Sequence, residues 1–143
     1  MPKFIAWFLS ISILIGCTSL DSTPSDDLDT CHEIYGPTDS TFQQIIGTYH
    51  GMLPAHRTIG IQSTLILNKD NTVNLHCEYT DKRNYDIFNE NGLFTLCKDT
   101  LSIHLEGNQQ IFYLIQNQQL KMLNRNKNEL TGLLKDQFIF VKE

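Results

Sequence analysis

Short stretches in which apolar and polar residues alternate dominate the chain after about residue 41. The range 73–79 places an apolar residue at every second position, and 61–67 does so apart from Ser63. Asn68–Thr72 between them has the composition of a turn. A period of two residues is typical of a strand with one buried and one solvated face. These two ranges therefore predict a β-hairpin.

Other short strands are predicted on both sides of this hairpin. One strand precedes it and ends near Leu53, because Pro54 lacks an amide donor. The later strands are expected around residues 94–96, 101–105, 113–115, 120–123 and 138–141. No stretch has a helical period long enough to cross a sheet. Many short strands separated by turns predict an all-β fold, and we expect a small antiparallel β-barrel, because closure removes exposed sheet edges.

A barrel of this size fills its interior with side chains and has room for at most one small ligand. Five aromatic residues are expected to pack in the core or at the mouth of the barrel, namely Tyr49, Tyr79, Phe88, Phe94 and Tyr113.

The first residues have the layout of a targeting segment. Lys3 precedes the apolar run Phe4–Ile15, which is shorter than the roughly 20 apolar residues of a spanning helix. The run ends in Leu14-Ile15-Gly16-Cys17, which resembles a bacterial lipobox. That resemblance implies cleavage before Cys17 and acylation of Cys17 with fatty acids such as palmitate. The alternative is an ordinary signal peptide with an accidental cysteine.

We therefore predict a lipoprotein signal peptide over residues 1–16, a lipid-anchored flexible tether over 17–41 and a barrel domain over 42–143. The tether is rich in Ser, Thr, Asp and Pro and has too few apolar residues to fold. Its aspartates have an alternative interpretation as an export cue to the cell exterior. Thr18, which stands where an inner-membrane lipoprotein has Asp, favours the outer membrane.

Composition narrows the function classes. A formal net charge of −5 argues against nucleic acid as a partner. The sequence has no nucleophile elbow, zinc-protease helix or phosphate-binding loop, and nothing selects a catalytic carboxylate pair. We therefore expect a protein that is not an enzyme.

Several segments resemble the N-terminal domain of the NlpE family in their order and spacing. They include Gly47–Pro54, Thr64–Leu67, Asn71–Leu75, Phe88–Phe94 and Leu120–Asn124. The resemblance implies a lipocalin-like barrel in a bacterial envelope lipoprotein tied to copper resistance and to surface or envelope-stress sensing.

One departure from the family concerns copper. The family's proposed copper motif is a Cys-x-x-Cys directly after Leu-Pro, where two thiolates bind Cu(I). This chain has Ala55–Thr58 at that place, with no cysteine. His50, Met52 and His56 form a substitute set of imidazole and thioether ligands; the alternative is that they are ordinary surface and core residues.

Three cysteines remain after Cys17. Cys31 lies on the predicted tether, Cys77 shares the inward phase of its strand, and Cys97 is out of phase with Phe94 and Leu96. We therefore expect no disulfide between Cys77 and Cys97, and none elsewhere, with Cys77 acting as a small buried apolar residue.

Three functions are compatible with these features. The leading hypothesis is an envelope protein of the NlpE type that senses stress or a surface through a protein partner. The alternative is a lipocalin-like carrier, which requires an apolar cavity open at one end. The third is a copper-handling protein.

Overall fold

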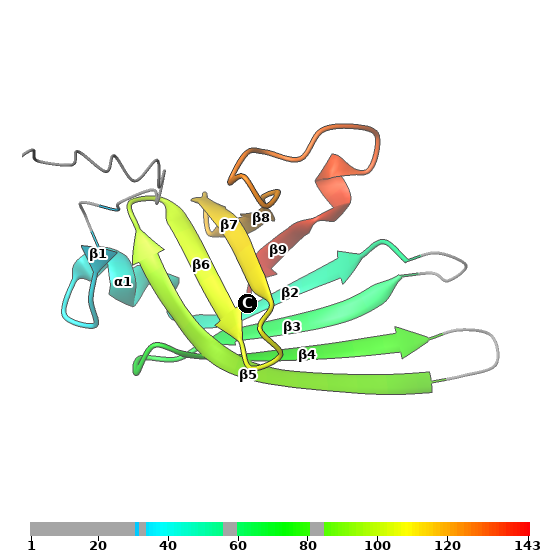
Figure 1. Ribbon diagram of the computed structural model, residues 1–143, viewed down its shortest axis with the longest axis horizontal. Coiled ribbons are helices and arrows are strands. Elements are labelled where there is room, and N and C mark those ends of the chain that lie inside the picture. Colours follow the sequence, from blue (N-terminus) through cyan, green and yellow to red (C-terminus); the bar gives the residue numbers. More distant parts are fainter. Residues whose placement is uncertain (1–30, 32–33, 56–59, 81–84) are drawn as a thin grey trace, which may run out of the picture. The chain divides into compact units, whose positions relative to one another are not determined.

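The computed structural model describes residue 31 and residues 34–55, 60–80 and 85–143, and it places Cys31–Glu143 in one compact unit. This unit consists of strands with little helix (Figure 1). Its elements, in chain order, are β1 (Ile34–Tyr35), α1 (Ser40–Ile45), β2 (Gly47–Leu53), β3 (Ile61–Leu67), β4 (Thr72–Thr80), β5 (Tyr85–Cys97), β6 (Thr100–Leu105), β7 (Gln110–Gln116), β8 (Gln119–Met122), the 3₁₀ helix η1 (Lys135–Gln137) and β9 (Ile139–Lys142).

All neighbouring strands pair antiparallel, in the order β5-β4-β3-β2-β9-β8-β7-β6. The pairing of β6 with β5 closes this order into an eight-stranded barrel. The predicted hairpin corresponds to β3 and β4, in register from Ile61↔Tyr79 to Leu67↔Val73. The prediction of a small antiparallel barrel is confirmed.

Strand β5 is the element that closes the barrel, because it belongs to both walls. Its residues Tyr85–Leu93 pair with β4, and Gly92–Cys97 pair with β6. Figure 1 shows β5 curving from one set of strands to the other. A Cβ at Gly92 would collide with the carbonyl oxygen of His104, so the crossover requires glycine.

The core fills the barrel interior between these walls. Phe42 stacks on Phe94 with ring centroids 5.4 Å apart, and Tyr113 meets Phe140 edge-on at 5.6 Å. The buried cluster comprises Phe42, Ile45, Tyr49, Leu65, Leu67, Val73, Leu75, Phe94, Leu96, Leu101, Ile103, Leu105, Tyr113, Leu120 and Phe140. Tyr49, Phe94 and Tyr113 are thus buried as expected, whereas Phe88 is 52% exposed and lies outside the buried core.

The folded unit begins earlier than predicted, at Cys31 and not at residue 42. In the expected tether, β1 pairs with the end of β5 through Ile34↔Cys97 and Tyr35↔Leu96. Helix α1 then packs Phe42 and Ile45 into the core. The segment folds because these few apolar residues bury against the barrel, although they are too few to form a core of their own.

The expectation of no disulfide was wrong as well. Cys31 and Cys97 form a disulfide bond, with their Cα atoms 6.0 Å apart. The strand pairing of β1 brings the preceding chain back to Cys97 and makes this possible. Cys77 keeps a free thiol, as expected, but it is only partly buried.

In the described part of the chain, neither helix has the length and apolar character needed to cross a bilayer.

Candidate functional site

The end of β2 carries two of the three predicted copper ligands. His50 and Met52 are two residues apart, so they lie on the same face of the strand, away from the core. The His50 ring has a partner on both sides: its Nδ1 lies 3.2 Å from Thr64 Oγ1 and its Nε2 lies 3.5 Å from Glu143 Oε2. The Met52 side chain is half-exposed and packs over Gly60. A metal ion here would have to displace one of the histidine's partners.

The rest of the predicted set cannot be placed. His56 and Cys17, the predicted lipidation site, lie outside the described residues. Among the residues that are described, no three His, Cys, Asp or Glu side chains gather closely enough to hold a metal ion. The copper set stays a prediction.

A row of polar side chains crosses the outer face of four strands. His50 on β2 pairs with Thr64 on β3, Thr64 with His76 on β4, and His76 with Asn89 on β5. Since side chains directly opposite each other in a sheet are neighbours, the row is continuous.

Of the two histidines in this row, His76 makes the shorter side-chain contacts. Its Nδ1 lies 2.6 Å from Asn89 Oδ1, and its Nε2 lies 3.1 Å from Glu78 Oε1. The hydrogen bond to Asn89, followed by that to Glu78, raises the pKa of His76 above 6.5. Burial, together with the charge and hydrogen bond of Glu78, raises the pKa of Tyr85, which is on the neighbouring part of β5. The four side chains form a connected group, the His76 cluster (Tyr85, Glu78, His76 and Asn89).

The alternation in residues 73–79 is enough to place His76 and Glu78 on the outer face, but it does not reveal the cluster. Its other two members belong to the first half of β5, which was not predicted as a strand. The alternation that could have identified it is obscured there, because Ile87 and Phe88 are adjacent apolar residues.

The inner face has a different chemistry. Tyr49 donates a hydrogen bond from its hydroxyl to the carbonyl oxygen of Ile45 at 2.8 Å, and burial raises its pKa to about 12. Burial also raises the pKa of Tyr113, with a smaller contribution from Cys77. The Cys77 thiol lies 3.5 Å from Ser63 Oγ. Neutral hydroxyls and one thiol inside an apolar core are fit for packing rather than for acid–base catalysis at neutral pH.

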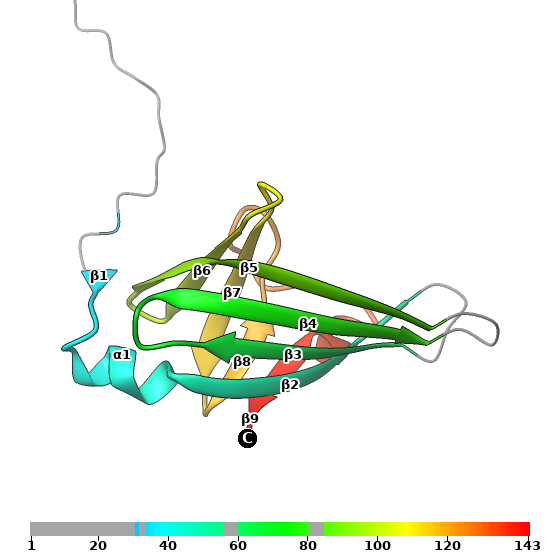
Figure 2. The same ribbon diagram turned by 90° about the horizontal axis from the view of Figure 1, so that it is seen from below.

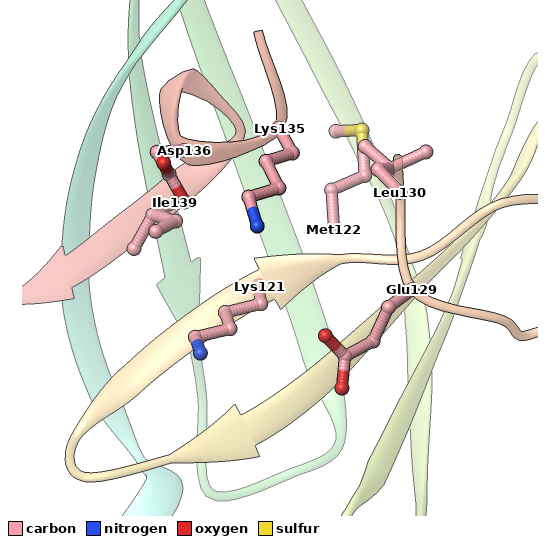
Figure 3. A pocket seen from close by; sticks show the side chains of 7 residues that line it. All are labelled: Lys121, Met122, Glu129, Leu130, Lys135, Asp136 and Ile139. Atoms are coloured by element: carbon pink, nitrogen blue, oxygen red, sulfur yellow. The ribbon is translucent and has the colours of Figure 1, made fainter. Parts of the chain in front are cut away.

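Described residues line a small hollow and a larger open groove. The first has a volume of about 100 Å³ and lies between β8, the segment at 129–130 and the η1–β9 region; Figure 3 shows its seven lining side chains, Lys121, Met122, Glu129, Leu130, Lys135, Asp136 and Ile139. That is well below the roughly 300 Å³ of the smallest usual ligand pockets.

The second hollow, of about 570 Å³, is an open surface groove where β5 passes between β4 and β6. Exposed side chains such as Asn74, Asn91 and His104 line it. Neither hollow is the apolar cavity inside the barrel that a lipocalin-like carrier requires.

Comparisons with known proteins agree with this architecture. The sequence profile of the NlpE N-terminal domain matches residues 49–133. The crystal structure of a candidate lipoprotein from Shewanella oneidensis is similar with a TM-score of 0.62 and 31% sequence identity, over 76% of this chain and 98% of that one.

The crystal structure of NlpE from Escherichia coli, described as the Cpx pathway activator, is similar with a TM-score of 0.56 and 25% identity. The match covers 61% of this chain and 46% of the Escherichia coli chain, so this chain spans less than half the length of that protein. No curated protein matches this chain.

Proposed function

Because this chain belongs to the family of NlpE N-terminal domains, we propose that it is a lipid-anchored envelope protein that senses stress or a surface through a protein partner. In this proposal it catalyses no reaction. The similarity to a candidate lipoprotein and to the activator of the Cpx pathway supports the envelope and signalling parts of the proposal.

The filled interior is the observation that favours sensing over carriage. Within the described residues, Tyr49, Tyr113 and Phe140 are at most 1% exposed and occupy the space that a lipocalin-like ligand would need. Binding a ligand there would require removing well-packed side chains from the core. A protein with a filled core acts through its surface.

Lipidation of Cys17 gives the protein its place in the envelope. Two or more acyl chains anchor stably, because each buried CH₂ contributes about 0.8 kcal/mol. Mass spectrometry of the mature protein should find acyl chains on Cys17, and Cys17→Ala should abolish them. An unmodified Cys17 in the wild-type protein would refute the anchor. Fractionation of the envelope would then test the outer membrane, which Thr18 favours.

The sensing role is tested in the native bacterium with a reporter of envelope stress. Overproduction of the lipidated chain should raise the reporter signal, and deletion should remove the response to surface contact. Overproduction of the Cys17→Ala chain is the control, because it shows how much of the reporter signal comes from overproducing any protein. A reporter that ignores both overproduction and deletion would end the proposal.

Copper handling is a separate proposal, supported by the placement of His50 and Met52 on one face of β2. It predicts Cu(I) uptake by the chain, measured by competition with a chromogenic chelator and lost in His56→Ala. No uptake by the wild-type chain would rule it out.

A further inference from the structure

The first half of β5 is an open sheet edge. Strand β4 pairs along β5 from Tyr85 to Leu93, whereas β6 pairs only from Gly92 onward. The last contact before this edge is the hydrogen bond from Glu106 N to Asn91 O, at 2.9 Å. Among the residues that the structure describes, no strand pairs with the other side of Tyr85–Glu90. Figure 2 shows the long strands β2 to β5 side by side.

The direction of the backbone groups follows from two hydrogen bonds. The Asn91 carbonyl faces the β6 side, and the Phe94 amide faces Asn71 on the β4 side. Since these directions alternate along a strand, Tyr85, Ile87 and Asn89 point their amide and carbonyl groups away from β4. No backbone partner for these groups occurs in the described chain. They form a template for one more strand.

This edge lacks lysine and proline, and its inward-pointing charged residues are Asp86 and Glu90. Lysine, proline and bulges commonly prevent pairing at sheet edges. The segment Tyr85–Glu90 has neither lysine nor proline, and Tyr85, Ile87 and Phe88 are 57%, 51% and 52% exposed. The His76 cluster holds Tyr85 and Asn89 on the outer face, so the strand is ordered before any partner arrives. This preorganisation of the strand reduces the conformational entropy that is lost on binding.

The charges of the edge select the partner. Asp86 and Glu90 share the inner face of the strand with Phe88 between them; Asp86 is exposed, whereas Glu90 is partly buried beside Gly107. The chain carries a net charge of −5. Pairing with a second copy, centred on Ile87, would make the two Asp86 side chains diagonal neighbours, and two anionic chains would repel each other. A strand with Lys or Arg opposite Asp86 and Glu90 has the complementary charge.

From this geometry we infer that β5 binds an extended segment of another protein, which adds antiparallel to Tyr85–Glu90. The segment carries basic residues opposite Asp86 and Glu90 and apolar residues opposite Ile87 and Phe88. This inference rests on the proposed function in one respect: the proposed function requires a protein partner, and the inference names the surface that binds this partner.

A synthetic peptide tests the inference directly. Its central sequence is Lys-Thr-Leu-Val-Lys-Val, which places the two lysines opposite Glu90 and Asp86 in an antiparallel pairing. Fluorescence anisotropy with the full chain in detergent should show saturable binding. A peptide with both lysines replaced by Glu should bind about tenfold or more weakly, because it places like charges directly opposite each other. Methylation of the peptide's backbone amides should weaken binding similarly.

The matching protein variant is Ile87→Pro. Its amide points to the open edge, so proline removes one donor to the partner without breaking the β4 ladder. We expect about tenfold weaker peptide binding, since one hydrogen bond and close approach are lost. Ile87→Thr, which keeps the amide, should bind nearly as the wild type does. Circular dichroism and urea unfolding establish that all variants are folded.

Three results of the peptide experiments would overturn the inference. They are absence of peptide binding, equal binding of the acidic peptide, and full binding by a folded Ile87→Pro. Sedimentation of the chain alone tests whether a second copy of the chain binds at this edge instead. A wild-type dimer that dissociates in the Ile87→Pro variant would assign the edge to a second copy and contradict the inference. Failure of the proposed function is recognised separately, by a stress reporter that ignores the protein while the peptide still binds.

Discussion

The two halves of β5 have similar apolar residues but different surroundings. In the second half, Phe94 and Leu96 are at most 1% exposed, because β6, β1 and α1 all pack around them. In the first half, Ile87 and Phe88 remain about half-exposed beside a single neighbour, β4. Burial along this strand is therefore decided by the number of neighbouring elements, and apolar residues that are left exposed are available for a partner.

The largest difference between the halves should appear when a phenylalanine is truncated. Phe94→Ala removes a ring stacked on Phe42 and should lower the free energy of unfolding by about 3–5 kcal/mol. Phe88→Ala, the matched control in the exposed half, should lower it by no more than about 1 kcal/mol. Urea unfolding measures both values. Equal losses would mean that the first half is also packed.

The next effect concerns the disulfide between Cys31 and Cys97, which holds the buried end of β5. The bond closes a loop with a sequence separation of 66 residues, so its removal should destabilise the fold by about 2–4 kcal/mol. A Cys31→Ser, Cys97→Ser double variant should unfold at lower urea concentration, with the free thiol Cys77 left in place. An unchanged midpoint of urea unfolding would show that β1 and α1 stay packed on the barrel without the disulfide bond.

A smaller effect is expected at high pH in the barrel core, where Tyr49 of β2 is buried. The pKa of Tyr49 is raised from 10.0 to about 12, so the unfolded chain releases this proton first. Stability should therefore fall as the pH rises from about 10 to 12, because the folded state binds more protons. Urea unfolding at several pH values measures the decline, and Tyr49→Phe should flatten it. The same slope in the variant would mean that other groups cause the loss.

The smallest effect belongs to the exposed half and the His76 cluster. The pKa of His76 is raised above 6.5, so its contribution to stability is fully present below pH 6.5 and is lost as the pH rises through the folded value. An NMR titration of the His76 ring should show the raised pKa. Asn89→Ala should bring it back toward 6.5, since the bond to Asn89 is the largest cause. A value unaffected by that change would mean that Asn89 does not organise this edge.

Much of the barrel could be predicted from the sequence, because alternation identifies a strand with one buried face. This worked for β3, β4 and β6, whose inner positions are largely buried. It failed for the first half of β5, where both faces are partly exposed and the apolar residues do not alternate. It also failed for β1 and α1, which fold only against the barrel.

The candidate site was predictable only in part, for a related reason. The outward position of His76 follows from the phase of β4, but its contact with Asn89 depends on the register between strands. The disulfide depends on the same kind of information, because β1 has to pair with β5 before Cys31 reaches Cys97. Neither the register of β4 with β5 nor the pairing of β1 with β5 can be predicted from the alternation of apolar and polar residues within one strand.

The disulfide also has a mechanical consequence. If Cys17 carries the lipid, any pull between the membrane and the folded unit reaches the fold at Cys31. The covalent bond passes that force directly to Cys97, at the end of β5, and β1 and α1 are bypassed. Tension would then act on the strand that closes the barrel, whose far end is the open edge from Tyr85 to Glu90.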